Sequence, residues 1–171
     1  MTKNRGIKMA ENKIKRSEFM AFLNTGTADS PVWSRMGKGI TSQVVSYNPA
    51  TTSETYIDED SATTNLDSYA VNISTPQTAY AGNAVFDYVD NLRQNRAVGA
   101  DAQAEVLLVY AYAKDGENTF KAERNNAVLQ IDDFGGEGGG SVVLNYTVNL
   151  NGNPVLGTAT VTDGTVTFTA E

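Results

Sequence analysis

The chain has 171 residues, a length that suits one domain with a substantial core. It has no cysteine and no histidine. The absence of these residues excludes disulfides, thiolate nucleophiles, histidine-based catalysis and the usual zinc sites. Catalysis would have to use carboxylates and lysines alone, and we expect neither an enzyme nor a cofactor. No apolar run of about 18 residues predicts a membrane span, and the basic N-terminus lacks the apolar stretch of a secretory signal.

The net charge of −7 is divided unevenly along the chain. Residues 1–16 contain six basic side chains against Glu11, which gives this stretch +5 and leaves −12 on the remaining 155 residues. We therefore expect a basic N-terminal arm, 1–18, and a single acidic domain, 19–171. An acidic body repels phosphate backbones, so sequence-specific nucleic-acid binding is not expected. The arm could grip an acidic surface, including that of another copy, or stay solvated.

Short strands and one long excursion are predicted in the first part of the domain. Phe19–Leu23 is an apolar run that predicts a strand, and residues 40–47 predict another that stops at Asn48-Pro49. Residues 69–74 alternate apolar and polar side chains, which is typical of a strand with one buried face. Between them, residues 48–68 are polar but strand-favouring, and we expect a long inter-strand loop.

One helix is predicted over residues 83–95. Asn83 suits the N-cap position, because its side-chain oxygen can accept a hydrogen bond from a free backbone N–H. Apolar residues follow at helical spacing, and Arg93 lies near the C-terminal end, where the helix dipole is negative. Gly99 follows as a stop signal.

The rest of the chain predicts antiparallel strands. Val106–Ala113 is apolar on both faces, as in a central strand, and Asp115-Gly116 predicts the turn after it. The glycine-rich stretch 135–141 predicts a hairpin tip, and Asn151-Gly152 and Asp163-Gly164 predict the two turns of a three-stranded meander. The expected fold class is mainly β, an antiparallel β-sandwich or barrel with one flanking α-helix, a long inter-strand loop and an N-terminal arm.

No motif for catalysis or metal binding emerges from the polar segments. The glycine-rich stretches lack the spacing of a phosphate-binding loop. Asp58, Glu59, Asp60 and Asp67 could attract a hard cation, but the EF-hand pattern fails because Ala62 and the residues after it supply no glycine for the sharp turn. A solvated acidic loop is the favoured interpretation, and we expect no metal.

Two stretches have a distinctive order of residues, SYNPATTSETYIDEDSA at 46–62 and GNAVFDYVDNLRQNRAVG at 82–99. Together with the basic arm and the run of strands after the helix, they resemble the major tail tube proteins of long-tailed bacteriophages. They are most similar to the tube proteins of phages and tailocins of Gram-positive hosts. The resemblance covers roughly residues 19–134.

The resemblance implies a structural protein of the virion tail, assembled in the host cytoplasm. Tube proteins of this family form hexameric rings whose inner sheets join into a β-barrel around a channel, with the helix outside. The rings stack into the tube through which the genome passes without specific DNA binding. A tape measure protein and tail tip or terminator proteins are implied as partners, and no membrane is involved.

In this family the loop after the second strand reaches the neighbouring ring, and the terminal extensions add contacts between subunits. We therefore expect contacts from the 48–68 segment and the arm, whose opposite charges make them candidate partners. In a free subunit the segment should be mobile, and in a tube it should be ordered. The candidate contact residues are Thr51, Glu54, Tyr56, Asp58, Glu59 and Asp60 in the segment, with Lys13, Lys15 and Arg16 in the arm.

Three alternatives stay open at this point. The first is the inner tube of a contractile phage tail or tailocin, which the same fold would serve. The second is a monomeric β-sandwich binding module, which would gather exposed aromatic residues on one sheet face. A carboxylate-based enzyme is the third, and the single Trp argues against a sugar-binding cleft.

Overall fold

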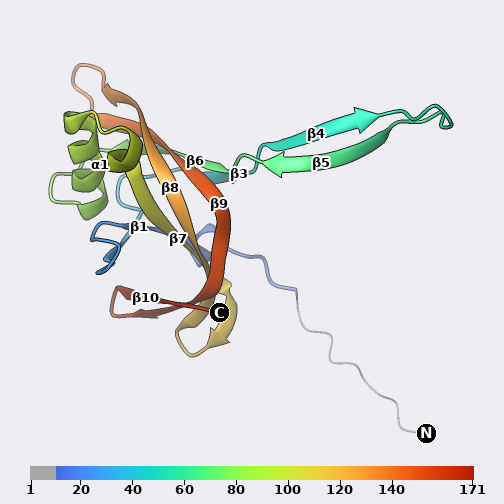
Figure 1. Cartoon of the computed structure of the whole chain (residues 1–171). Coiled ribbons are helices and arrows are strands. Elements are labelled where there is room, and N and C mark those ends of the chain that lie inside the picture. Colours follow the sequence, from blue (N-terminus) through green and yellow to red (C-terminus); the bar gives the residue numbers. More distant parts are fainter. Residues whose placement is uncertain (1–10) are drawn as a thin grey trace, which may run out of the picture.

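The computed structural model describes residues 11–171. Its strands pair antiparallel throughout these residues, with one α-helix (Figure 1). No helix among them is long and apolar enough to cross a membrane. The elements are η1 (Arg16–Glu18), β1 (Phe19–Asn24), β2 (Trp33–Arg35), β3 (Val44–Ser46), β4 (Pro49–Glu54), β5 (Thr63–Tyr69), β6 (Asn72–Thr78), α1 (Ala84–Asn95), η2 (Gly99–Ala102), β7 (Gln103–Gly116), β8 (Thr119–Gly135), β9 (Val143–Thr162) and β10 (Thr165–Ala170).

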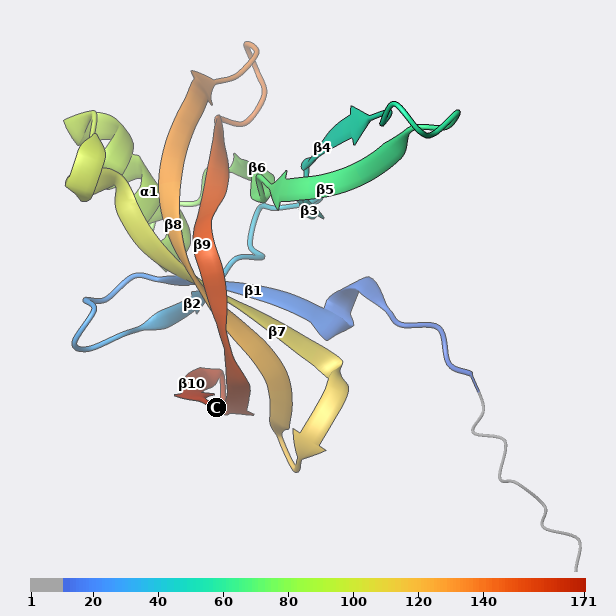
Figure 2. The same cartoon turned by 45° about the vertical axis from the view of Figure 1, so that its right-hand side comes forward.

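The main sheet has eight strands and is organised by β9. Its order is β2-β1-β7-β8-β9-β6-β3, and β10 also pairs with β9. The first part of β9, Val143–Asn149, pairs with β6, whereas its last part, Gly157–Thr162, pairs with β10. We call the part of the sheet around Val143–Asn149, which α1 covers, the α1 half. The part around Gly157–Thr162 is the β10 half. Figure 2 shows the long strands β7, β8 and β9 running through both halves.

Two hydrophobic cores lie on opposite faces of the central strands β1 and β7. Leu23 and Leu108 enter the first core, which α1 covers. Phe22 and Leu107 point the other way, into a second core closed by Trp33. Each fully buried side chain of this size contributes about 1.5–3 kcal/mol. The apolar run Val106–Ala113 was therefore correctly predicted as a central strand over residues 106–110, whereas residues 111–113 pair with neither neighbour and Tyr112 is exposed.

The helix α1 matches its sequence prediction. The side chain of Asn83 accepts a hydrogen bond from the backbone N–H of Phe86 at 3.0 Å, as an N-cap does. Val85, Phe86 and Val89 are buried against the first core. The helix ends at Asn95, and its C-cap Arg96 adopts the left-handed conformation with φ 47°, so the stop comes three residues before the predicted Gly99.

The segment 48–68, expected as a loop, is a β-hairpin in the structure. Strands β4 and β5 form a separate two-stranded sheet that projects from the body (Figure 1). The polar composition predicted exposure, but it hid the strand pairing, because neither face of this hairpin packs on a core.

The prediction of a turn at Asn151-Gly152 is wrong, because strand β9 continues through these two residues. Arg124 of β8 pairs with Val155 and Asn126 pairs with Asn151, so the extra residues of β9 form a bulge between them. Gly152 has φ 69°, the positive angle that asparagine-glycine turns also use. Here β8 supplies pairing partners on both sides of the bulge, so the strand bends instead of reversing.

The other turn and strand predictions are mixed. Asp163-Gly164 forms the two-residue turn between β9 and β10, with positive φ at both residues, as predicted. The turn after β7 lies at Glu117-Asn118, two residues later than predicted, because Gly116 still pairs with Thr119. The glycine-rich stretch joins the paired strands β8 and β9, as expected of a hairpin tip.

Candidate interaction surfaces

The β4–β5 hairpin is exposed along its whole length. At its base the Asn48 side-chain amide donates to the carbonyl of Ala70 at 2.9 Å. Further out, the hydroxyls of Ser53 and Thr64 are hydrogen-bonded at 2.8 Å, and Thr52 donates to Asp67. An isolated two-stranded hairpin is marginally stable in water. Both faces of this hairpin are exposed, so a second protein chain could cover either face.

The hairpin tip combines apolar and acidic side chains. Tyr56 is 51% exposed and Ile57 is fully exposed. Glu54 and the three acids at 58–60 surround them, and all four carboxylates are exposed. Tyr56 and Ile57 therefore form a small exposed apolar surface that acidic side chains surround. The candidates Thr51, Glu54, Tyr56, Asp58, Glu59 and Asp60 all lie on this hairpin.

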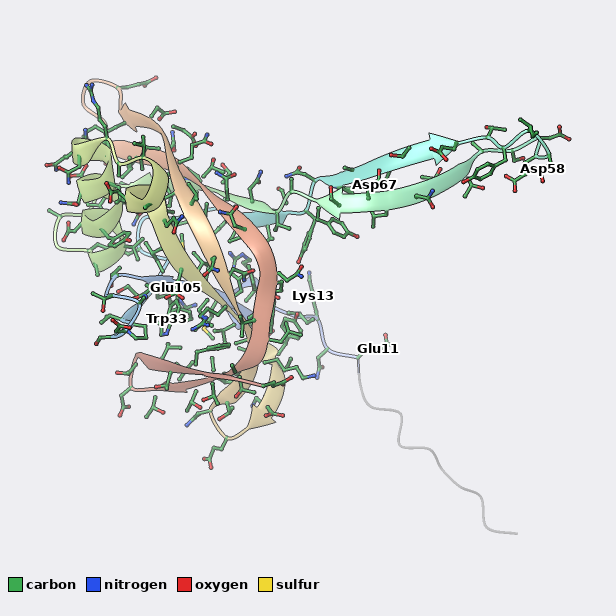
Figure 3. All side chains as sticks on the ribbon, in the orientation of Figure 1. Glu11, Lys13, Trp33, Asp58, Asp67 and Glu105 are labelled. Atoms are coloured by element: carbon green, nitrogen blue, oxygen red, sulfur yellow. The ribbon has the colours of Figure 1, made fainter. Side chains whose placement is uncertain are left out.

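The described part of the basic arm lies far from that tip. Figure 3 shows Lys13 near the body, where the chain leaves η1, and Asp58 at the far end of the hairpin. Within residues 11–171 the ion pairs are Arg93–Asp90 and Arg124–Glu105, and neither involves the arm or the hairpin. One subunit therefore does not join Lys13 or Lys15 to the acids at 58–60. Residues 1–10 of the arm lie outside the described residues.

Arg16 has a different role from the two lysines. Its guanidinium donates to the carbonyl oxygens of Phe19 at 2.7 Å and Gln43 at 3.1 Å, and lies 5.0 Å from the Phe19 ring centre. These contacts hold the start of β1 against the segment before β3. Arg16 therefore fixes the point from which the arm leaves the body, a role that the sequence did not predict.

Two strand edges of the α1 half are open in the described structure. β3 pairs only with β6, and Val44 on β3 is 64% exposed. β8 pairs with β7 only as far as Val128, so its segment 129–135 has β9 on one side and no strand on the other. Unpaired edges are ready to pair with another chain. The sequence did not reveal them, because strand register depends on partners that are distant in the chain.

A groove of about 560 Å³ follows the open edge of β8. Leu92, Val98 and Ile131 supply apolar lining, and Val98 is exposed. Arg93 lies over the Phe134 ring at 4.0 Å and pairs with Asp90 at 2.7 Å. Burial tends to raise the pKa of Asp90, but hydrogen bonds from Arg93 and Gln94, with the Arg93 charge, outweigh it and lower that pKa.

No group of three or more carboxylates gathers to hold a metal ion in the described part of the chain. Of the four acids that could attract a cation, Asp58, Glu59 and Asp60 lie at the hairpin tip, whereas Asp67 lies further back on β5 (Figure 3). Among the surfaces that residues 11–171 offer are therefore a projecting hairpin, the last part of the basic arm and the two open edges of the α1 half.

These features define a class of protein with an antiparallel β body, a helix on one face and a projecting hairpin. A chain in the solved structure "Tail of empty GTA particle computed with helical refinement, C6 symmetry" has the same fold, with a TM-score of 0.61. The two are 12% identical, and the match covers 92% of this chain and 100% of that one. No protein-family model and no curated protein sequence matches the chain. The likeness shows that the chain has the fold of a subunit in that particle's tail.

Proposed function

We propose that the protein is the tube subunit of a phage tail, in which six copies form a ring and rings stack around a channel for the genome. The main support is the shared fold over nearly the whole of both chains, in a tail with sixfold symmetry. The open edges, the exposed hairpin and the charged arm supply the surfaces that such an assembly needs. The sequence resemblance independently points to the same protein class.

Ring closure would use the two open edges of the α1 half. The β3 edge of one copy would meet the 129–135 edge of β8 in the next, which is a heterologous contact that closes after six copies. Val44 and Phe134 are both exposed near these edges, at 64% and 44%, and pairing would cover them. The groove beside β8 provides apolar surface for the same neighbour.

Ring stacking would use the hairpin and the arm. The hairpin extends beyond the body, so its tip can reach a subunit of the next ring (Figure 1). Opposite charges make the arm of a neighbouring copy, with Lys13 and Lys15, a suitable partner for Glu54 and the acids at 58–60. The hairpin would become immobile on stacking. A tape measure protein and tail tip or terminator proteins would complete the tail.

A contractile tail or tailocin is the closest alternative, because its inner tube could use the same subunit. A neighbouring sheath gene would distinguish the two. A monomeric binding module has less support, since the exposed tyrosines do not share one sheet face. Tyr56 lies at the hairpin tip, Tyr47 and Tyr69 at its base, and Tyr112 on β7. The type of host stays a prediction from the sequence.

Shortening the hairpin tests the proposal. In the variant, residues 53–64 are replaced by Asn-Gly, a two-residue turn that joins the paired residues Thr52 and Asn65. Wild-type protein should form rings and tubes in negative-stain micrographs at high concentration. The shortened variant should keep its circular dichroism spectrum and its melting temperature but form no tubes.

A control with Ser53→Ala and Thr64→Ala removes one hydrogen bond but keeps the hairpin length, and it should still assemble. Normal tubes from the shortened variant would show that stacking does not need the hairpin. A wild-type protein that stays monomeric at every concentration and salt level, even with tail tip proteins present, would contradict the tube assignment.

A further inference from the structure

A groove of about 280 Å³ lies where the arm joins the body, and we call it the root groove. Its walls are the start of β1 and the segment that connects β2 to β3. Its floor belongs to the first core, in which Met36 is buried and against which Ile40 packs. Arg16 joins the two walls, because its guanidinium donates to a carbonyl oxygen on each of them. The groove is therefore an apolar hollow with a fixed rim.

The root groove is positively charged. Arg16 and Arg35 contribute to its described lining, which contains no carboxylate, and both side chains are exposed. The Arg35 side chain lies against Gly37 at the rim, and neither ion pair within residues 11–171 uses it. Residues 13–43 contain five basic and two acidic side chains, a net charge of +3. The groove therefore lies in a positive region of an otherwise acidic body.

The hairpin tip has the complementary properties. Its apex is a turn in which the backbone N–H of Glu59 donates to the carbonyl of Tyr56 at 3.0 Å, so the fully exposed Ile57 lies at the outermost point. Residues 49–69 contain five carboxylates and no lysine or arginine. Arginine binds carboxylates through its planar set of N–H donors. An apolar side chain beside carboxylates therefore matches an apolar groove with arginines at its rim.

Other grooves of the described chain fit an acidic tip less well. The groove at the base of the hairpin, about 860 Å³, is lined by Asp67 and Glu123, and we call it the base groove. A groove of about 500 Å³ beside β7 contains Glu105 and no basic lining residue. Carboxylates in both would repel the tip. The root groove is smaller, but a cavity of about 150 Å³ already holds a benzene molecule, so it has room for one large apolar side chain.

We propose that the root groove receives the hairpin tip of a subunit in the neighbouring ring, with Ile57 in the groove and Glu59 facing the arginines of the rim. This inference rests on the proposed tube function and names the docking site of its stacking contact. The contact joins two copies, because the tip of one chain lies far from the root of its own arm (Figure 3). Lys13 and Lys15 continue the positive surface on the arm, where Asp58 and Asp60 would meet them. Tip and groove are different surfaces, so each added ring leaves free sites for the next.

Cross-linking can locate the tip, because the chain contains no cysteine. Ser61→Cys places a thiol at the exposed tip, and Thr41→Cys places one at an exposed position of the root groove. Subunits with one substitution are mixed with subunits that have the other, assembled into tubes and treated with a short bismaleimide. The mixture should give covalent dimers on a denaturing gel, and each variant alone should not. Asn153→Cys in the base groove, mixed with Ser61→Cys, is the control and should give none.

Two substitutions test the energetics of the contact. Ile57→Ala should raise the concentration needed for tube formation roughly tenfold, because the apolar floor of the groove would stay largely uncovered. Arg35→Glu should raise it as well, because a carboxylate at the rim would repel the tip. The matched controls are Val32→Ala, at an exposed apolar residue outside the groove, and Lys114→Glu, with the same change in net charge. All four side chains are exposed, so melting temperatures should match the wild type, and only Ile57→Ala and Arg35→Glu should impair sedimentation of tubes.

The outcomes separate the docking site from the function. Cross-linking of the tip to the base groove at least as strong as to the root groove would overturn the inference, although tubes form. Normal tubes without any cross-link between tip and root groove would overturn it too. So would wild-type assembly of both Ile57→Ala and Arg35→Glu. Failure of the wild type to form any tube would instead contradict the proposed function, and the docking site with it.

Discussion

The phenolic hydroxyl of Tyr146 in β9 donates a hydrogen bond to Oε1 of Gln77 in β6, at 3.1 Å, inside the first core. The Gln77 amide nitrogen in turn donates to the carbonyl of Lys38 at 3.1 Å and to Oδ1 of Asn83 at 3.3 Å. Asn83 is the N-cap of α1. A chain of polar groups therefore links the sheet to the start of the helix, and no buried side-chain polar atom in residues 11–171 lacks a partner.

Replacing Tyr146 with Phe should destabilise the protein without unfolding it. The substitution leaves Oε1 of Gln77 buried without its donor, which costs about 1–3 kcal/mol. Urea denaturation followed by circular dichroism measures the loss. In a double-mutant cycle with Gln77→Leu, the two losses should not add, because both substitutions remove the same hydrogen bond. Additive losses would mean that the two side chains do not interact energetically.

Stability should fall at alkaline pH because three tyrosines, Tyr88, Tyr110 and Tyr146, are harder to ionise in the folded protein. Burial raises the pKa of Tyr146, and burial followed by the nearby Glu123 raises the pKa of Tyr110. A raised pKa stabilises the fold below the unfolded value of about 10, and this contribution is lost as pH rises above it. The free energy of unfolding should decline above about pH 10, and less steeply in Tyr146→Phe. Identical slopes would exclude a contribution from Tyr146.

The cap of α1 can be tested by two substitutions at one position. Asn83→Ala removes the oxygen that accepts from Phe86 and from Gln77, and should cost about 1–2 kcal/mol. Asn83→Ser keeps a capping oxygen and should lose clearly less. Thermal unfolding monitored at 222 nm compares the variants. Equal melting temperatures for alanine and serine would mean that capping does not stabilise this helix.

Two glycines of β9 should respond differently to alanine. A Cβ on Gly157 would overlap the carbonyl oxygen of Thr169, so β10 would have to move, at a cost of about 1–3 kcal/mol or more. A Cβ on Gly152 meets no atom within 4 Å, and its cost of about 1–2 kcal/mol arises only from its φ of 69°. Urea denaturation should rank Gly157→Ala as the less stable variant. The reverse order would show that β10 adapts to the added methyl group.

Charge reversal tests the contact proposed between the arm and the hairpin tip. Lys13→Glu with Lys15→Glu should raise the concentration needed for tube formation, and added salt should weaken wild-type assembly. Reversing the partner acids, with Asp58→Lys and Asp60→Lys, should restore assembly of the arm variant. Sedimentation of tubes measures each effect. Without rescue by the second pair, direct contact between these charges would be excluded.

The sequence correctly predicted those elements whose stabilising interactions lie within one short segment of the chain. The helix was predicted because Asn83, the apolar stripe and Arg93 all act within one short segment. Asn151-Gly152 misled because it has the residues of a tight turn, while the pairing of β8 on both sides of it decided the outcome. The tip acids were correctly predicted as exposed, but the root groove brings together the start of β1 and the segment before β3, so no local pattern in the sequence reveals it.

The connection of the hairpin to the body has a mechanical consequence. Strand β5 leads into β6 after two residues, and all seven residues of β6 are paired with β9, from Asn72↔Asn149 to Thr78↔Val143. Hydrogen bonds between antiparallel strands lie across the strand direction. A pull on the hairpin along β6 would therefore load these bonds in shear, so that they resist together instead of opening one by one. Tension between neighbouring copies would be carried by the longest strand of the protein.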